Sequence, residues 1–288
     1  MPCPQKRVKM PLKKTSIMNK VFKDSFDLVL EMGEELNHHF WEVKEDLLKG
    51  KETTHAYIDE AIEKKMMMAL KKIKPNSSFL AEESFKRSNE EMNQGWKEEG
   101  PFWIIDPLDG SNNFYRGIDL FAISLAYAER GEVLFSFVHR PITQESYLAI
   151  KGEGAFYLRG KKLNKWEKIN SKEKKKGEML LSFSIHLPLE ELEVKWSSLI
   201  KVFRQVKSVR RFGCTSLEIC LSSFSSMDLH YQVGSFPWDI AAGLLFCREA
   251  GGEVYTLKGE FADYFDQEFF ISRRALSKEL RSALAALS

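Results

Sequence analysis

The chain is organised around residues 103–114, which run Trp103-Ile104-Ile105-Asp106-Pro107-Leu108-Asp109-Gly110-Ser111-Asn112-Asn113-Phe114. The short apolar run from Phe102 to Ile105 predicts a buried strand. Pro107 removes a backbone donor and biases Asp106 away from the helical conformation, so we expect the regular element to end there. The stretch therefore places two carboxylates and a glycine at one edge of a sheet.

Three residues of this stretch offer a set of hard oxygen donors: Asp106, Asp109 and the carbonyl of Leu108. Mg²⁺ prefers such oxygens and keeps coordination positions for water and substrate phosphates. The amides of Gly110 and Ser111 can face an anion, and Ser111 can cap the helix that follows. Taken alone, the motif is also typical of an acidic surface turn. The buried strand before it and the acids elsewhere in the chain favour a metal and phosphate site.

The charge distribution separates a basic start from a mildly acidic body. Residues 1–20 contain six lysines or arginines and no acidic residue, whereas the remaining 268 residues contain 37 basic and 41 acidic side chains. We expect residues 1–20 to form a disordered tail. The acidic body argues against nucleic-acid binding as the main role of the protein.

Composition and cysteine spacing predict a cytoplasmic globular protein. With 43% apolar and 29% charged residues, the 288-residue chain can bury a large core. No apolar run reaches the ~18 residues that a membrane span requires. The four cysteines include no Cys-x-x-Cys pair, so we expect reduced thiols and neither a disulfide framework nor a zinc site.

Residues 21–175 have the pattern of an α+β half. Apolar residues at three- and four-residue spacing predict helices over residues 22–48 and 55–73. Short apolar or alternating runs predict strands at residues 79–81, 121–128, 133–138, 146–150 and 155–158. We expect the two helices to pack against a largely antiparallel sheet.

Residues 176–288 alternate strand and helix, which favours an α/β half. Strands are predicted at residues 179–183, 205–210 and 229–233, and helices over residues 189–203 and from Ser277. Thr215 and Glu218 have the spacing of a capping box that would open another helix. A further helix is predicted to begin near Asp239 and to end at the paired glycines 251 and 252.

Two more groups of acids follow an apolar segment or open a helix. Glu82 and Glu83 follow the strand predicted at residues 79–81, and Asp239 lies at a predicted helix start. Alone, the two glutamates are typical surface charges, and Asp239 is typical of an acid that satisfies a helix dipole. If these acids converge with those of residues 106–109, they suit two or more Mg²⁺ ions and a phosphate. That arrangement serves in-line displacement by a metal-bound water.

These motifs resemble those of the inositol monophosphatase family, within the fructose-1,6-bisphosphatase-like group of Mg²⁺-dependent, lithium-sensitive phosphatases. The resemblance runs from about residue 20 to the end of the chain. The matching segments are Ala81-Glu82-Glu83-Ser84, residues 103–114, Pro237-Trp238-Asp239 through Gly243, and Glu249-Ala250-Gly251-Gly252, with lesser matches at residues 152–155 and 210–213. The resemblance implies a layered αβαβα sugar-phosphatase fold, with N-terminal helices on a largely antiparallel sheet and a C-terminal α/β half.

The resemblance also implies metal roles for the acids. Glu82, Asp106 and the Leu108 carbonyl would hold a first Mg²⁺ ion that activates the attacking water. Asp106, Asp109 and Asp239 would hold a second ion that stabilises the leaving oxygen. The loop at residues 49–54 matches the family's mobile loop and would bring a weaker third metal contact.

The remaining roles implied by the resemblance concern water, phosphate and substrate. Ser111, assisted by Glu82, would orient the water, and the amides of Gly110 and Ser111 would bind the phosphate. Ser111 stands where the family usually has Thr, and Gln232 where inositol-hydrolysing members usually have Glu. An amide at 232 can still hydrogen-bond a hydroxyl and tolerates a nearby phosphate better than a carboxylate would. Together with the metal-site residues Leu108 and Asp239, the expected substrate contacts are Gly110, Ser111, Gly213, Cys214, Thr215 and Gln232.

The sequence therefore predicts a cytoplasmic, Mg²⁺-dependent phosphomonoesterase that uses two or three metal ions and forms a homodimer, as relatives often do. The expected substrate is a small phosphorylated polyol, myo-inositol monophosphate first. Fructose 1,6-bisphosphate and a 3′(2′),5′-bisphosphate nucleotide are the alternative substrates. A non-catalytic partner protein that binds RNA or a polymerase is the alternative from another class, and retention of the metal-binding acids argues against it.

Overall fold

The computed structural model describes most of the chain. The described residues are 7–8, 16–51, 57–84, 100–160, 166–169, 179–224, 227–272 and 278–285. Most of the loop expected at residues 49–54 and the boundary expected between residues 175 and 176 lie outside them. Within these ranges, no helix is both long enough and apolar enough to cross a membrane.

An eight-stranded sheet forms the first half of the molecule. Neighbouring strands are antiparallel except β2 and β3, which run parallel. In sheet order the strands are β1 (Arg7–Val8), β8 (Trp166–Lys168), β7 (Gly154–Arg159), β6 (Glu145–Ile150), β5 (Glu132–Arg140), β4 (Ala122–Glu129), β3 (Pro101–Asp109) and β2 (Ser78–Ala81). The largely antiparallel sheet predicted from the sequence is confirmed.

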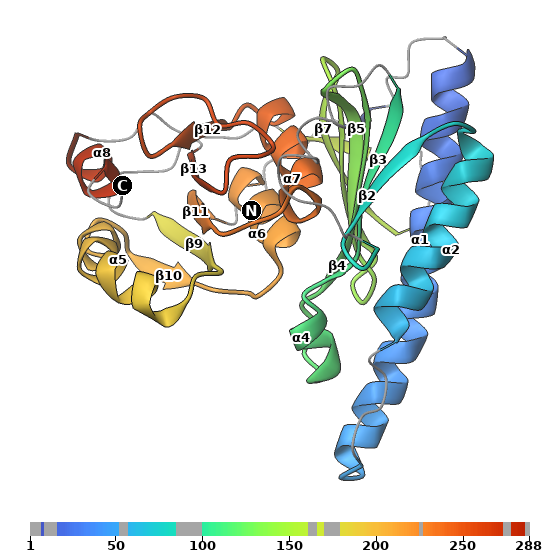
Figure 1. The fold of residues 1–288 in the computed structure, drawn as a ribbon, viewed down its shortest axis with the longest axis horizontal. Helices are drawn as coiled ribbons and strands as arrows, with labels where there is room; N and C mark the ends of the chain where they lie inside the picture. The colour runs from blue at the N-terminus through green and yellow to red at the C-terminus, as the bar shows by residue number, and fades with distance from the viewer. Residues whose placement is uncertain are drawn as a thin grey trace.

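Two long helices, α1 (Ser16–Leu48) and α2 (Ile58–Ile73), cover one face of this sheet (Figure 1). Helix α1 contributes aromatic rings to this contact: the ring of Phe22 lies 5.3 Å from that of Phe135 and 4.9 Å from that of Phe137, between centroids. Helix α1 begins at Ser16, six residues before the predicted start, because no proline or glycine follows Pro11 to stop it. The predicted tail of residues 1–20 thus overlaps helix α1, and it also contains the edge strand β1.

A five-stranded mixed sheet forms the second half. Its strands, in order, are β10 (Ser208–Arg210), β9 (Leu180–Ile185), β11 (Leu229–Val233), β13 (Glu268–Ser272) and β12 (Glu253–Thr256). The first three strands are parallel, and β13 is antiparallel to both of its neighbours. Helices α5 (Leu189–Phe203) and α8 (Lys278–Ala285) pack together outside this sheet (Figure 1).

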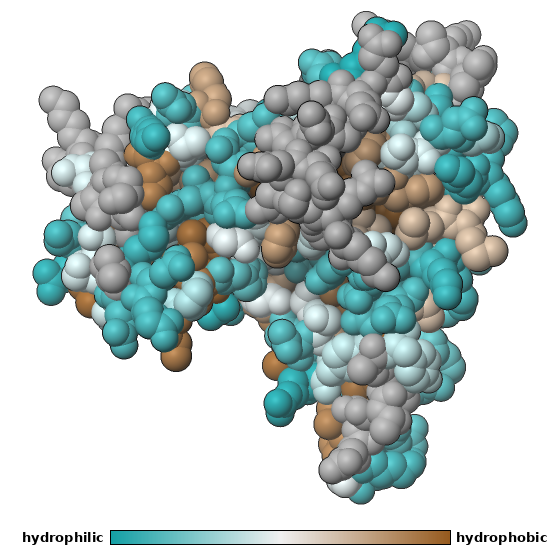
Figure 2. All heavy atoms as spheres, in the orientation of Figure 1, coloured by the Kyte–Doolittle hydropathy of each residue, from teal (hydrophilic) through white to brown (hydrophobic). Residues whose placement is uncertain are grey.

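Helices α6 (Thr215–Ser223) and α7 (Pro237–Glu249) lie between the two sheets and complete a five-layer αβαβα arrangement (Figure 1). Small residues let the two helices approach closely: a Cβ on Gly243 would lie 2.9 Å from the Cβ of Ile219. Hydroxyls of the first sheet donate to α7 carbonyls, from Ser124 to Trp238 and from Ser136 to Ala242. The expected layered fold is confirmed. In the surface view a notch separates the lobe of the second sheet from α4 (Ser111–Tyr115) and the end of α1 (Figure 2).

Strand β3 extends further than the sequence indicated. It continues through Pro107 to Asp109, and its pairing with β4 shifts register between Asp106 and Asp109. A register shift of this kind bends a strand and redirects its side chains. The expectation that regular structure stops at Asp106 was therefore wrong, but the irregularity does fall between the two acids.

Two predicted helix starts also differ. Thr215 and Glu218 make no capping box: Thr215 is the first residue of α6, and the Glu218 carboxylate accepts the N–H groups of Phe212 and Gly213. Ser111 is likewise the first residue of α4 rather than its cap, which is Gly110. Gly110 has φ +90°, and a Cβ there would lie 2.8 Å from the Leu120 carbonyl oxygen. Only glycine fits that conformation and that contact.

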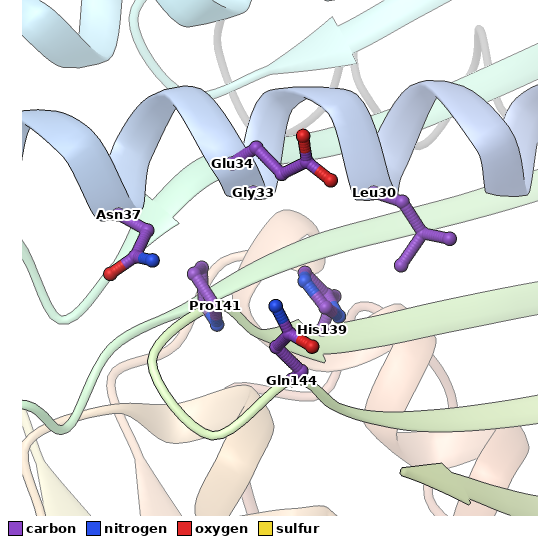
Figure 3. Close-up of a pocket in the computed structure, with 7 residues that line it drawn as sticks. All are labelled: Leu30, Gly33, Glu34, Asn37, His139, Pro141 and Gln144. Carbon is purple, nitrogen blue, oxygen red and sulfur yellow. The ribbon is translucent and has the colours of Figure 1, made fainter. Parts of the chain in front are cut away.

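A small pocket lies between α1 and the first sheet, next to a close contact at Gly33 (Figure 3). Helix α1 passes over the imidazole of His139 at Gly33, where a Cβ would lie 2.5 Å from His139 Cδ2. His139 is buried, with Nδ1 2.8 Å from the hydroxyl of Ser146, and burial lowers its pKa to about 4. The neutral ring therefore acts as a fixed packing surface for the helix.

We expect Gly33→Ala to lower the free energy of unfolding by about 1–2 kcal/mol. Alanine favours a helix interior by about 1 kcal/mol over glycine, but overpacking a rigid contact costs about 1–3 kcal/mol. Urea denaturation measures the difference. In a His139→Ala background the clash is absent, so the same substitution should be neutral or stabilising. An equal loss in both backgrounds would contradict the packing role of His139.

Candidate active site

A cavity of about 330 Å³ lies where the two halves meet, within the size range of small-molecule sites. Its walls come from the ends of β2, β3 and β9 and from the starts of α4, α6 and α7. The lining residues are Glu82, Asp106, Leu108, Asp109, Gly110, Ser111, Asn112, His186, Gly213, Thr215, Gly234, Phe236, Trp238 and Asp239. The structure thus brings the three predicted groups of acids to one cavity, although they are up to 157 positions apart in the chain.

Glu82 reaches the cavity from the turn after β2, and a second glutamate fixes that turn. Glu63 of α2 is 1% exposed; its carboxylate accepts the N–H of Glu83 at 2.8 Å and bonds the Ser84 hydroxyl. Glu83 does not line the cavity. The sequence prediction missed Glu63. The pattern that could have revealed it is an acid on the buried face of α2, beside the apolar residues Ile62 and Met66.

Glu82 and Asp106 face each other closely enough for their carboxyl groups to share a hydrogen bond. Burial raises the pKa of Asp106 well above its ordinary range, and the neighbouring charges of Glu82, Asp109 and Asp239 raise it further. Burial also raises the pKa of Glu82. Two carboxyl groups in contact need a shared proton or a cation between them.

Asp109 joins the two halves through the start of α6. Its carboxylate accepts the amides of Thr215 (3.0 Å) and Ser216 (2.6 Å), the Ser216 hydroxyl (2.6 Å) and the thiol of Cys214 (3.2 Å). It therefore satisfies the first two free N–H groups of α6, a task of the kind that Thr215 was expected to perform. Burial raises the pKa of Asp109, while these donors lower it.

Asp239 lies in the first turn of α7. Its carboxylate accepts the N–H of Phe236 at 2.8 Å, and Pro237 occupies the first position of the helix. Burial raises its pKa well above the ordinary range, and the charge of Asp109 contributes in the same direction. The helix thus presents an acid to the cavity at the predicted position.

Asn113 fastens the turn after β3 to the second half. Its Nδ2 donates to the carbonyls of Leu120 and Phe212, both at 2.7 Å, and lies 3.3 Å from that of Gly213. Glu218 holds the same segment from the other side through the amides of Phe212 and Gly213, at 2.7 and 2.9 Å. The sequence prediction assigned neither residue this role, because the partners of each are backbone groups that no sequence pattern marks.

Two residues expected to contact substrate lie behind the cavity wall. Cys214 is fully buried, with its thiol directed at Asp109. Gln232 is fully buried in β11, where its Oε1 lies 3.0 Å from His230 Nε2. Neither lines the cavity, and their roles as substrate contacts stay predictions.

Chemically, the acids suit a hard cation. Four carboxyl groups line one cavity, and the repulsion that raises the pKa of Asp106 would be relieved by a divalent ion. Among the described residues, no three aspartate, glutamate, histidine or cysteine side chains already have the arrangement needed to hold a metal ion. Asp109 and Asp239 instead direct oxygens at the backbone of α6 and of residue 236. The donor chemistry of the four carboxyl groups and the Leu108 carbonyl fits Mg²⁺.

A buried polar pair lies next to the Phe212–Gly213 segment, whose amides Glu218 accepts. Glu218 Oε2 is 3.7 Å from His230 Nδ1, and both side chains are fully buried. Burial raises the pKa of Glu218 to about 8 and lowers that of His230 to about 4, so both groups are neutral at pH 7. The contact is therefore not an ion pair, although its geometry would allow one.

The raised pKa of Glu218 predicts that stability falls as pH rises from about 4.5 to 8. The folded state keeps a proton that the unfolded chain releases, so the slope is at most about 1.4 kcal/mol per pH unit. Glu218→Gln retains an acceptor for Phe212 and Gly213 but does not titrate. Urea denaturation at pH 6.5, 7.2 and 8 should show wild type losing stability relative to the variant. A constant difference would show that Glu218 is already ionised.

Comparisons with known proteins agree with this geometry. A family model described as inositol monophosphatase family matches residues 18–288. The chain is 30% identical to the inositol-1-monophosphatase of Mesorhizobium japonicum (89% of this chain, 94% of the relative). It is 29% identical to Nus factor SuhB of Pasteurella multocida (76% and 79%). It is 28% identical to the fructose-1,6-bisphosphatase/inositol-1-monophosphatase of Thermotoga maritima (77% and 79%).

A solved structure is similar over nearly the whole length. The Thermotoga maritima IMPase aligns with a TM-score of 0.73 at 26% identity, covering 92% of this chain and 97% of that one. The family match, the related phosphatases and the shared fold point the same way. The chain belongs to the inositol monophosphatase family and is a phosphoric monoester hydrolase.

Proposed function

We propose that the protein is a Mg²⁺-dependent phosphomonoesterase that hydrolyses a small phosphorylated polyol, myo-inositol monophosphate first. One observation carries the proposal: Glu82, Asp106, Asp109 and Asp239 line one cavity together with Gly110 and Ser111. Carboxylates that can hold a cation lie beside a turn that can bind an anion. This combination suits a phosphate ester.

The metal-holding residues in this proposal are Glu82, Asp106, Asp109, Asp239 and the Leu108 carbonyl, for two or three ions. Mg²⁺ bound there would supply the Lewis acidity that activates water and neutralises charge on the phosphoryl group. The Ser111 hydroxyl and Glu82 orient the attacking water. The backbone at Gly110 and Ser111 binds the phosphate oxygens, because the first amides of α4 have no acceptor within that helix.

The identity of the alcohol is the finer part of the proposal. Inositol-1-monophosphatase relatives support myo-inositol monophosphate, and a relative named fructose-1,6-bisphosphatase/inositol-1-monophosphatase supports the bisphosphate alternative. A 3′(2′),5′-bisphosphate nucleotide is the third candidate. Each ester would be hydrolysed by the same metal-dependent reaction. Contacts between the alcohol and the cavity wall beyond the acids would therefore determine which ester is preferred.

A panel of phosphate esters assayed with and without Mg²⁺ tests the function. We expect Mg²⁺-dependent phosphate release from myo-inositol 1-phosphate, fructose 1,6-bisphosphate or adenosine 3′,5′-bisphosphate, and none after chelation. The ester with the highest kcat/KM identifies the substrate class. A protein that is inert on every ester, with Mg²⁺ bound as shown by calorimetry, would overturn the enzymatic proposal.

The partner-protein alternative rests on the relative named Nus factor SuhB. A binding role would use a surface that hydrolysis does not require. Capture of RNA polymerase or RNA that survives Asp239→Asn but disappears when residues 1–15, which precede α1, are deleted would support it. If neither the wild-type protein nor Asp239→Asn captures RNA polymerase or RNA, the binding role is excluded.

The homodimer and the cytoplasmic location are also part of the proposal. The relatives' names state neither of them. Light scattering after size-exclusion chromatography would give a mass near twice the 33.3 kDa of one chain if the dimer forms. A mass of one chain at micromolar concentration would contradict it.

A further inference from the structure

Helix α4 brings Ser111 to the cavity, but it is only five residues long and projects from the end of the first sheet (Figure 1). A helix of that length is not stable by itself, so contacts with other elements must fix its position. Asn113 supplies one of them by donating to a carbonyl of the second half. The buried ring of Phe114 supplies another, because it packs against that of Phe40 in α1 with centroids 5.8 Å apart. Tyr115, the last residue of α4, makes a third contact.

Tyr115 connects α4 to α2. Its half-buried hydroxyl donates to Asp59 Oδ1 at 3.3 Å. Asp59 lies in the first turn of α2, where its Oδ1 also accepts the N–H of Glu60 at 3.3 Å. Residues four apart share a face of a helix, so Tyr115 lies on the same face of α4 as Ser111. The hydrogen bond therefore joins the start of α2 to the helix face that leads to the cavity.

The same helix α2 holds the turn that carries Glu82. Glu63, four residues after Asp59 and on the same face of α2, accepts the N–H of Glu83 at 2.8 Å. Pairing of β2 with β3 ends at Ala81, and the N–H of Glu82 still donates to a β3 carbonyl at 3.3 Å. Beyond that bond, Glu63 holds the next two residues of the turn. Helix α2 therefore links the Tyr115 contact to the Glu82 turn.

The hydroxyl of Tyr115 lies among acids. Burial raises the pKa of Glu83 to about 7, and the charge of Asp59 is the next cause. After burial and Asp109, the charge of Asp59 also raises the pKa of Glu82. Burial and the charge of Asp59 raise the pKa of Tyr115, so its hydroxyl stays a neutral donor. A neutral donor orients Asp59 without adding a positive charge that would compete with a metal ion for the acids.

We propose that Tyr115 is a positioning residue of this site: through Asp59 and α2 it fixes the Glu82 turn relative to α4 and thereby sets the affinity for Mg²⁺. This inference rests on the proposed metal-dependent phosphatase function. Groups that orient metal ligands without touching the metal typically contribute about 10–100-fold to metal affinity or activity. Tyr115 acts through two further contacts, so we expect an effect at the lower end of that range.

Tyr115→Phe removes the hydroxyl and keeps the ring. Calorimetric titration with Mg²⁺ should show a Kd raised about tenfold, while kcat at saturating Mg²⁺ stays within about threefold because the metal ligands are intact. Tyr157→Phe is the matched control: Tyr157 donates a half-buried hydroxyl to Glu145 at 2.6 Å and lies outside the cavity. This control loses a hydrogen bond of the same kind but should keep the wild-type Kd. Equal weakening in both variants, or an unchanged Kd in Tyr115→Phe, would overturn the proposal.

A double-mutant cycle tests the route through Asp59. In an Asp59→Ala background, Tyr115→Phe should change the Kd for Mg²⁺ by less than about twofold, because the acceptor of the hydroxyl is already absent. A further rise of about tenfold in that background would show that Tyr115 does not act through Asp59, and the proposal would be wrong.

The Mg²⁺ titration also separates this inference from the phosphatase proposal. If Tyr115→Phe weakens Mg²⁺ binding as expected but the wild-type protein hydrolyses no ester, the positioning role stands and the phosphatase proposal fails. If hydrolysis depends on Mg²⁺ but Tyr115→Phe keeps the wild-type Kd, the positioning role fails and the phosphatase proposal stands. A wild-type protein that binds no Mg²⁺ would contradict both.

Discussion

Asp106→Asn is expected to lower kcat at least about 10³-fold at saturating Mg²⁺. The charges of all three other cavity acids raise the pKa of Asp106, which places it among them in the cavity. Replacing it with an amide removes a charge from the cation site and a ligand from both proposed ions. Removing one electrostatic group at a reacting centre lowers kcat about 10²–10³-fold, and removing a ligand shared by two metal ions lowers kcat further. Phosphate release over a Mg²⁺ titration measures the effect.

The same variant makes a second prediction that separates lost chemistry from lost folding. Without metal, Asp106→Asn should have a melting temperature equal to or above that of wild type. The variant removes a buried carboxyl group whose negative charge is destabilised by the neighbouring acids. Added Mg²⁺ should then raise the melting temperature of wild type by several degrees and that of the variant by less.

Asp119→Asn is the matched control for Asp106→Asn. Asp119 is an exposed acid close to α4 and lies outside the cavity. It should retain wild-type kcat and the full Mg²⁺ response in melting. An Asp106→Asn protein that keeps more than a tenth of wild-type activity would contradict the proposed metal site.

Asn113→Asp should lower the free energy of unfolding by about 3 kcal/mol and reduce kcat/KM about a hundredfold. The amide donates to two carbonyls at 2.7 Å, and a carboxylate of the same shape would turn an acceptor toward both of them and toward Gly213. Both 2.7 Å bonds are half-buried, so each unsatisfied carbonyl costs an amount near the lower end of the ~1–3 kcal/mol of a fully buried group, and repulsion from the carboxylate adds to it. The turn that carries Gly110 and Ser111 would separate from the loop before α6, so the phosphate and substrate walls would lose their alignment.

Urea denaturation and steady-state kinetics measure these two losses for Asn113→Asp. The control for stability is Asn112→Asp, the same change at an adjacent exposed side chain of the cavity wall, which should alter the free energy of unfolding by less than about 0.5 kcal/mol. If Asn113→Asp is as stable as wild type, the amide does not hold the halves together. If it is unstable but keeps full activity, alignment of the turn is not its role.

The sequence predicted the local features well, for reasons visible in particular residues. The apolar run at residues 102–105 lies in strand β3, as predicted, although that strand continues to Asp109. Residues 189–203 form α5 and residues 229–233 form β11, as predicted. Gly251, with φ +84°, follows the end of α7. Periodicity, proline and glycine act over a few residues, so the chain carries these signals by itself.

The sequence also named all four acids of the cavity. Glu82 follows β2, Asp106 and Asp109 lie in the irregular last part of β3, and Asp239 lies in the first turn of α7. Such ends meet at one edge of a layered fold. Helix starts were less well predicted: the Thr215–Glu218 spacing mimicked a capping box, while Asp109, 106 positions earlier in the chain, satisfies the α6 amides. A carboxylate supplied from another element leaves no local pattern.

The sequence by itself thus determined most of the order of helices and strands, without β1 and β8, and the acids that a cation would need. Only the tertiary structure decided what holds and shapes the cavity: Glu63 under the Glu82 turn, Asn113 between the halves, and Phe236 stacked on Trp238 at its wall. The physical reason is that these contacts join residues through backbone groups, ring faces and burial. Their strength depends on distances in space, which the order of residues does not state.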